Sequence, residues 1–281
     1  LSARLDDKGM PAAWFHRVTG SSIIARFAPP AMKNGVDPDA VEGAADLQYK
    51  IPAMRVEYVR HEPPVATAFW RGVGATHNVF VVESFIDELA SAARQDPVAY
   101  RRAMLGSSPR MLAVLNLAAE KANWKSPLKP IAGRRVGRGV SAQFAFGSYM
   151  AQVAEVSVGG DGEVRVHRVV CAVDCGQTIN PDTVVAQIEG GVIFGITAAL
   201  WGEVTFDKGR VQQSNFADYR IMRMNEAPVV EVHIVNSHDD PGGIGEPGTA
   251  AIAPAVANAV FAATGKRLRK LPIDSRQLVK A

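Results

Sequence analysis

The sequence is poor in cysteine, with only Cys171 and Cys175 among 281 residues. Two thiols make no disulfide framework, and an iron–sulfur cluster generally needs four cysteine ligands. Both cysteines lie in a strand-like run, so buried free thiols are favoured over a metal or redox site. The sequence therefore excludes an iron–sulfur cluster held by four cysteines of this chain.

The sequence also lacks an excess of charge of one sign and long apolar runs. Lys and Arg number 31 against 28 Asp and Glu, and the basic residues are scattered except at Lys266–Lys270. No run of 18 uncharged apolar residues occurs, and the nearest approach, Gly190–Trp201, is too short to span a bilayer. We expect no nucleic-acid partner and no membrane span. No signal peptide is recognised, so we expect a cytoplasmic protein, with the periplasm as the alternative.

Several common catalytic motifs are missing. The sequence has no Gly-x-Ser-x-Gly elbow, no His-Glu-x-x-His pair and no Walker A loop. Gly243–Gly248 matches the dinucleotide fingerprint G-x-G-x-x-G, but a polar loop separates it from the preceding strand. No acid follows about 20 residues later to hold a ribose, since the next after Glu246 is Asp274. A nicotinamide-dependent dehydrogenase is therefore only a weak alternative, which NAD binding in a thermal-shift titration would test.

The most informative stretch is 241–265. It places Glu246 in a glycine- and proline-rich turn, directly before a helix of small apolar residues predicted at Thr249–Thr264, with Gly265 as its C-terminal cap. A single carboxylate on a rigid turn, surrounded by backbone N–H groups, is typical of a catalytic or ligand-binding site. Glu246 is therefore the candidate base.

Hydrophobic periodicity and turn residues predict an α+β fold, with two lobes of mixed β-sheet packed with helices. The basic connector Lys125–Arg138 is the candidate boundary, giving lobes 1–130 and 131–281. The segment 28–46 is expected to be a loop. Strands are predicted at Trp14–Val18, Val56–Arg60, Gly139–Phe144, Tyr149–Val158, Glu163–Asp174 and Val229–Val235, and helices at Val81–Ala93, Pro97–Gly106, Pro109–Asn123 and Asp182–Leu200.

Two other positions are candidates for ligand binding. Arg71 precedes the glycine turn Gly72-Val-Gly74, where a guanidinium beside flexible backbone N–H groups suits a phosphate or a pterin-like heterocycle. A structural turn with Arg71 in a salt bridge is an equally good interpretation. Gln187 lies in the predicted apolar helix, either on a solvent-facing stripe or buried with hydrogen-bond partners.

Three motifs together carry a family resemblance: Ala68-Phe-Trp-Arg-Gly-Val-Gly74, Asp174-Cys-Gly-Gln-Thr-Ile-Asn-Pro181 followed by Ala186-Gln-Ile-Glu-Gly-Gly191, and Gly243-Ile-Gly-Glu-Pro-Gly248. In this order and at these intervals, the sequence resembles the C-terminal part of the molybdopterin-binding large subunit of the xanthine oxidase (molybdenum hydroxylase) family. The bacterial isoquinoline 1-oxidoreductase beta-subunit and aldehyde dehydrogenase branch is the most similar type. The likeness covers about residues 50–273.

The resemblance implies roles for the candidate residues. Glu246 would be the general base in the oxidative hydroxylation of an aldehyde or N-heteroaromatic carbon, with water as the oxygen source. Arg71, Gly72, Gly74, Gln187 and Gly245 would contact a molybdopterin cytosine dinucleotide cofactor, which itself holds the molybdenum. No protein metal-ligand cluster is then needed. The substrate pocket would include Val73, Ala142 and Gln143. Val73 and Ala142 stand where many family members carry an aromatic residue, which leaves a roomier, more aliphatic pocket.

The resemblance also implies partners. Family large subunits are much longer than this chain, so a further chain would carry their N-terminal part, including a missing cofactor-binding loop. The 2Fe–2S clusters of the family would belong to a separate electron-transfer subunit. The alternative function is a truncated, non-catalytic molybdopterin-binding or assembly module that needs a partner chain.

Overall fold

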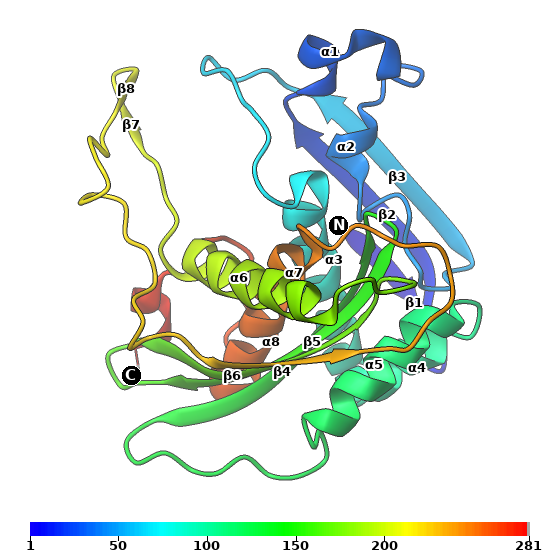
Figure 1. Ribbon diagram of the computed structural model, residues 1–281, viewed down its shortest axis with the longest axis vertical. Helices are drawn as coiled ribbons and strands as arrows, with labels where there is room; N and C mark the ends of the chain where they lie inside the picture. Colours follow the sequence, from blue (N-terminus) through cyan, green and yellow to red (C-terminus); the bar gives the residue numbers. More distant parts are fainter. Residues whose placement is uncertain (280–281) are drawn as a thin grey trace.

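The computed structural model describes residues 1–279, which form two main sheets and a small hairpin surrounded by helices (Figure 1). The N-terminal sheet has strand order β1-β2-β3, with β1 antiparallel and β3 parallel to β2. The central sheet has the order β4-β5-β6-β9, with β9 parallel to β6 and the other neighbours antiparallel. This mixture of sheets and helices confirms the predicted α+β class.

The predicted strands and helices are present, with shifted ends. The strands are β1 (Ser2–Leu5), β2 (Pro11–Gly20), β3 (Ala53–Arg60), β4 (Arg135–Ala145), β5 (Ser148–Val158), β6 (Val164–Asp174), β7 (Phe206–Asp207), β8 (Arg210–Val211) and β9 (Val229–Ile234). The longer helices are α3 (Val73–Ala92), α4 (Pro97–Met104), α5 (Pro109–Lys121), α6 (Pro181–Leu200) and α8 (Ile252–Thr264). The short ones are α1 (Ile24–Phe27), α2 (Pro38–Val41), α7 (Pro247–Ala250) and the 3-10 turns η1 (Pro29–Ala31) and η2 (Ser275–Leu278).

The central sheet is buried on both faces. Successive side chains of a strand point to opposite sides, so each strand contributes residues to two hydrophobic clusters. On β5, Met150 and Ala154 pack with the apolar residues of α6 and α8, whereas Ala151 and Val153 pack with those of α4 and α5. The cluster on the α5 side also contains Trp14, so it draws residues from both sides of the connector. The division near residue 130 stays a prediction.

Two elements in the first half of the chain differ from the predictions for local reasons. Helix α3 begins at Val73, eight residues before the predicted start at Val81, because Gly72 caps it in the left-handed conformation with φ 93°. The segment predicted to be a loop contains α2, since the Asp37 side chain accepts hydrogen bonds from the N–H groups of Asp39 and Ala40. The same Asp-Pro start correctly predicted α4, so this signal was available in the sequence.

Two apolar stretches, Pro181–Leu200 and Pro247–Thr264, are long and apolar enough to cross a membrane by length and composition. Half of the best window of the first, and 78% of that of the second, is buried inside the protein. Core helices of globular proteins pass the same test, and both stretches contribute to the hydrophobic cluster beside the central sheet. Their burial favours the interpretation that they are core helices.

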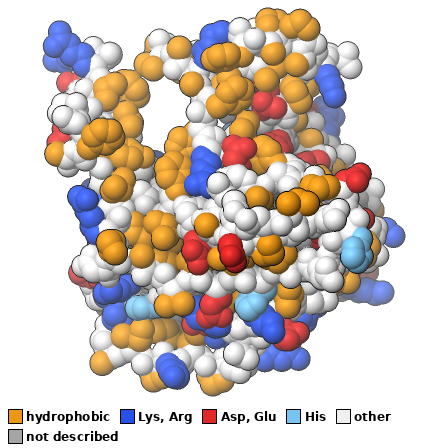
Figure 2. Space-filling view, in the orientation of Figure 1, with side chains coloured by type: hydrophobic (Ala, Val, Ile, Leu, Met, Phe, Trp, Pro, Cys, Tyr) orange, Lys and Arg blue, Asp and Glu red, His pale blue; other side chains and the backbone are white. Residues whose placement is uncertain are grey.

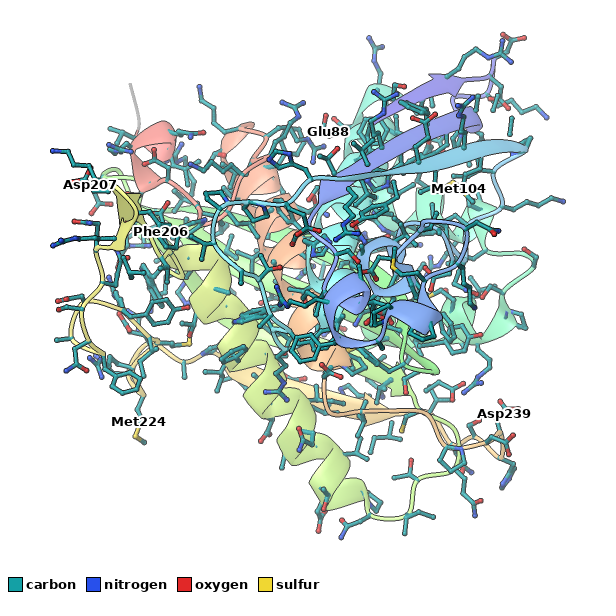
Figure 3. The ribbon with its side chains drawn as sticks, turned by 90° about the horizontal axis from the view of Figure 1, so that it is seen from above. Glu88, Met104, Phe206, Asp207, Met224 and Asp239 are labelled. Atoms are coloured by element: carbon teal, nitrogen blue, oxygen red, sulfur yellow. The ribbon has the colours of Figure 1, made fainter. Side chains whose placement is uncertain are left out.

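An extended arm formed by residues 202–228 leaves the body of the protein and carries the β7–β8 hairpin (Figure 1). Figure 2 shows an opening between this arm and the rest of the molecule, with hydrophobic side chains along the arm. Phe216 is 92% exposed and Met224 98% exposed. Figure 3 shows Phe206 and Met224 at the periphery of the molecule. The arm therefore presents apolar side chains that no described part of the chain covers.

Candidate functional site

The turn around Glu246 lies at the start of a broken helix. Glu246 caps α7, Pro247 occupies its first position, and α8 continues after Ala251 to Gly265, which is left-handed with φ 72°. Pro254 has no N–H to donate to the carbonyl of Ala250, which accounts for the break in a helix predicted to be continuous. Glu246 is thus held at the beginning of a rigid, largely buried helical segment.

Polar side chains of the central sheet fix the backbone of this turn. Gln143 Nε2 donates to the Pro247 carbonyl at 2.5 Å, and Gln152 Nε2 donates to the Gly248 carbonyl at 3.1 Å. Both glutamines are buried, and their Oε1 atoms have no partner among the described residues. Ser148 Oγ donates to the carbonyl of Gly243, on the other side of Glu246, at 2.8 Å. We call Gln143 and Gln152 the glutamine clamp.

The N-terminus of α3 contacts the Glu246 turn directly. The backbone N–H of Gly72 donates to Glu246 Oε1 at 3.0 Å. Arg71 donates from Nε and Nη2 to the Gly245 carbonyl, at 2.9 and 2.6 Å, and from Nη2 to Gln187 Oε1 at 3.0 Å. Five predicted site residues, from three widely separated stretches of the sequence, therefore meet at one place.

The backbone between Arg71 and Gly74 adopts a conformation that most residues avoid. A Cβ added to Gly72 would lie 1.9 Å from Thr76 Oγ1, and one added to Gly74 would lie 1.6 Å from the Asp39 carbonyl oxygen. Val73 has φ 46°, which is rare for a β-branched residue. Residues in such rare backbone conformations persist only where the surrounding structure fixes them, and they cluster at active sites and ligand-binding turns.

The remaining predicted residues lie around this centre. Val73 lines a cavity of about 450 Å³ beside Trp70 and Gly74. Ala142 is buried, and its N–H donates to Glu83 Oε2 at 2.9 Å. Gln143 is part of the glutamine clamp behind Glu246. The assignment of Val73, Ala142 and Gln143 to a substrate pocket stays a prediction.

Sequence reasoning did not identify three parts of this region. Gln152 pairs with Ser141 across β4 and β5, and a polar side chain in an otherwise apolar strand was the available signal. Glu83 is fully buried against Arg101, with Nε to Oε2 at 2.9 Å, and also accepts from Tyr49. Glu42 lies on the segment after α2, where burial raises its pKa to about 7, helped by the charges of Asp46, Asp39 and Glu246. No local sequence pattern indicates the position of Glu42.

The donors at the site fit an anionic or heteroaromatic cofactor. Among the described residues, Arg71 Nη1 and Gln187 Nε2 make no hydrogen bond within the protein. Gln187 is exposed on α6. A Cβ added to Gly191 of the same helix would lie 3.2 Å from the backbone of Gly248. No group of three or more His, Cys, Asp or Glu that could hold a metal ion occurs within residues 1–279.

Residues 72–228 match the model of a family described as a molybdopterin cofactor-binding domain. The chain belongs to this family. The match confirms the resemblance to the molybdenum-binding subunit of molybdenum hydroxylases, and it includes Gln187 but neither Arg71 nor Glu246.

Named relatives of the family are bacterial oxidoreductase subunits. The chain is 35% identical to the beta subunit of isoquinoline 1-oxidoreductase from Brevundimonas diminuta, over 92% of this chain and 33% of that protein. It is 36% identical to a nicotinate dehydrogenase subunit of Pseudomonas putida, over 82% of this chain and 21% of that protein. The chain thus spans a third or less of these two relatives.

Solved structures show the same fold at low sequence identity. The quinoline 2-oxidoreductase of Pseudomonas putida 86 matches 98% of this chain and 61% of its own, with a TM-score of 0.75 and 15% identity. The aldehyde oxidoreductase of Desulfovibrio desulfuricans matches 98% of this chain and 47% of its own, with a TM-score of 0.75 and 16% identity. These likenesses establish the architecture of the family in this chain.

Proposed function

We propose that this chain is part of a molybdenum hydroxylase that oxidatively hydroxylates an aldehyde or an N-heteroaromatic carbon, with Glu246 as the general base. The observation that carries the proposal is the hydrogen bond from Gly72 N–H to Glu246 Oε1, which places one carboxylate beside the Arg71–Gln187 pair. A general base must lie within hydrogen-bond reach of the proton it removes and be held in place.

Glu246 is suited to this task by its surroundings. The side chain is partly buried at the start of α7, and one oxygen is held by the Gly72 N–H. The other oxygen is then available to take the proton lost by the water-derived oxygen as it attacks the substrate carbon. The Gly-Pro backbone and the glutamine clamp limit how far the carboxylate moves, which favours a fixed geometry for proton transfer.

The cofactor residues of the proposal are Arg71, Gly72, Gly74, Gln187 and Gly245. When bound, a molybdenum–pterin cofactor supplies the centre that accepts two electrons from the substrate. Arg71 and Gln187 would donate hydrogen bonds to its polar atoms, while the glycines allow close approach of the backbone. We propose the cytosine dinucleotide form of the cofactor.

We further propose two kinds of partner. Cys171 and Cys175 are both free and buried, so 2Fe–2S clusters would reside in a separate electron-transfer subunit. The second partner is the polypeptide corresponding to the rest of the longer relatives, in the same or another chain. Its presence would cover the apolar arm, where Phe216 and Met224 are almost fully exposed.

A second candidate function is a non-catalytic cofactor-binding or assembly module. The chain covers 33% of the length of one relative and 21% of that of another. Molybdenum and released nucleotide should be measured on the chain purified alone and with its native neighbours. Near-stoichiometric molybdenum with a cytosine nucleotide and turnover of an aldehyde or heteroaromatic supports the hydroxylase. Molybdenum without any turnover supports the module, and no molybdenum in either preparation contradicts both.

A further inference from the structure

A cavity of about 450 Å³ lies between the end of β2, the segment of α2 and the start of α3. We call it the α3 cavity. Its volume is in the usual range for small-molecule sites. Its wall includes three apolar or aromatic residues, Phe69, Trp70 and Val73, and three ionisable ones, Asp37, Asp39 and His77.

The α3 cavity adjoins the Glu246 site through the turn before α3. Trp70 and Val73 belong to its wall, and Gly72, which lies between them in the sequence, donates its N–H to Glu246 Oε1 at 3.0 Å. Trp70 is held in place by stacking on Phe194 of α6, with ring centres 4.9 Å apart. A ligand in the cavity would therefore contact the same short segment that anchors the candidate base.

The two aspartates of the wall differ in how their carboxylates are satisfied. Asp37 accepts a hydrogen bond from Ser22 Oγ at 2.7 Å and others from backbone N–H groups at the starts of α1 and α2. The Asp39 carboxylate makes no hydrogen bond or ion pair with any of residues 1–279. Asp39 therefore offers the cavity a carboxylate that is free to bind a ligand.

The wall supplies no cation to offset this charge. No lysine or arginine lines the cavity among the described residues. Burial is the largest cause that lowers the pKa of His77, so its imidazole is neutral at pH 8. Burial and the nearby charge of Asp37 both raise the pKa of Asp39. A cation bound beside Asp39 would relieve the repulsion between the two carboxylates.

The aromatic side chains of the wall favour an organic cation over a metal ion. A metal ion takes several oxygen ligands, and the Asp37 oxygens are already occupied by donors of the protein. Phe69 is 48% exposed and Trp70 39% exposed, so both rings are within reach of a ligand. Aromatic faces attract organic cations, and a carboxylate adds to this attraction. A planar ring that carries positive charge satisfies both features.

We propose that the α3 cavity binds planar organic cations of the N-heteroaromatic class, with Asp39 as the charge partner and Trp70 as the stacking surface. The proposal of a binding site depends only on the cavity and its wall. As a substrate class, cationic N-heteroaromatics, it rests on the proposed function. Molecules that carry a carboxylate should be rejected, because like charges brought together at a binding site are unfavourable.

The binding test uses three quinoline derivatives of similar shape at pH 8: the cation N-methylquinolinium, the uncharged 2-methylquinoline and the anion quinoline-2-carboxylate. Calorimetric titration is carried out on the chain alone and on its complex with native partners. We expect the cation to bind about tenfold or more tightly than the uncharged ring, and the carboxylate to bind most weakly. Equal affinity for cation and uncharged ring would overturn the proposal. So would binding to the chain that is lost in the complex, because a partner would then fill the cavity.

Two variants locate the ligand. Asp39→Asn keeps the shape of the side chain but removes its charge, so the preference for the cation should be lost. Asp207→Asn is the matched control, because Asp207 is exposed at the periphery of the molecule and does not line the cavity (Figure 3). Trp70→Leu should weaken binding of both rings. Provided that thermal unfolding shows each variant to be folded, a preference kept in Asp39→Asn, or affinities unchanged in Trp70→Leu, would overturn the proposal.

Turnover by the molybdenum-loaded complex separates the substrate class from the proposed function. A kcat/KM that favours N-methylquinolinium over 2-methylquinoline, and no longer does so in Asp39→Asn, supports the substrate class. Turnover of uncharged rings or aldehydes without turnover of the cation contradicts the substrate class alone. Lack of turnover of every aldehyde and heteroaromatic at full molybdenum content contradicts the proposed function instead, and the titrations still decide whether the cavity binds cations.

Discussion

The backbone N–H of Gly72 donates a 3.0 Å hydrogen bond to the carboxylate of Glu246, across 174 positions of the chain. The donor lies at the left-handed cap of α3 and the acceptor at the start of α7. The two residues therefore join a helix N-terminus to a Gly-Pro turn, and the helix dipole favours a negative charge at this point. The geometry around this bond underlies the predictions below.

Gly72→Ala should destabilise the protein and displace Glu246. The residue has φ 93°, and its new Cβ would lie 1.9 Å from Thr76 Oγ1. We expect a loss of roughly 1–3 kcal/mol in the free energy of unfolding. Gly160→Ala is the control, because nothing lies within 4 Å of its added Cβ. Urea unfolding measures both, and equal stability of the two variants would contradict the strained turn.

Replacing a member of the glutamine clamp should loosen the Glu246 turn. Gln152→Leu leaves the Gly248 carbonyl without its donor, and an unsatisfied buried carbonyl costs about 1–3 kcal/mol. The exposed Gln177→Leu serves as a control. In the loaded enzyme, kcat should fall more than KM rises, because the carboxylate is misplaced rather than lost. A Gln152→Leu variant with unchanged unfolding and kcat would rule out the clamp.

The buried pair Arg101–Glu83 should matter more for stability than any exposed ion pair. Both side chains are essentially inaccessible to solvent, and Glu83 also accepts the N–H of Ala142. Arg101→Met leaves a buried carboxylate without its cation, which destabilises proteins by about 3–5 kcal/mol. Arg276→Ala, which breaks a pair in which Arg276 is 88% exposed, should change stability by less than about 1 kcal/mol. Chemical denaturation of both variants tests the contrast.

Acid should weaken the loop that follows β6. Arg110 donates two hydrogen bonds to Asp174, and these bonds hold the pKa of Asp174 below its usual value. A lowered folded pKa gives stability that is present above the unfolded value near 3.8 and lost as the pH falls through the folded value. Asp174→Asn should therefore lower Tm at pH 6 and show a smaller further loss between pH 5 and pH 3. Parallel Tm curves for the two proteins would contradict this linkage.

Much of the architecture could be predicted from local signals. Asp96-Pro97 and Ser108-Pro109 marked the starts of α4 and α5, and Gly265 marked the end of α8, since these residues have defined roles at helix ends. The arrangement of strands was harder, because β9 pairs with β6 across the whole of α6 and the arm. Such pairing depends on tertiary packing that no local pattern records.

Site residues that lie in unusual sequence motifs could be predicted, whereas buried residues of this region that lie in ordinary sequence could not. Arg71, Gln187 and Glu246 stood out in glycine-rich or apolar surroundings, and the structure brings them together. Whether they perform the assigned roles stays a prediction. Glu42 and Glu83 sit in unremarkable sequence, and their surroundings exist only after α2, α3 and β4 have packed.

Glu246→Gln tests the central claim most directly, measured as turnover per bound molybdenum in the complex with native partners. The substitution keeps the shape of the side chain and the acceptor for Gly72 N–H but removes its basicity. We predict unchanged molybdenum content and a fall in kcat of at least about 100-fold, as expected for loss of a general base. Turnover per molybdenum equal to that of the unmodified protein would contradict the assignment of Glu246 as the base.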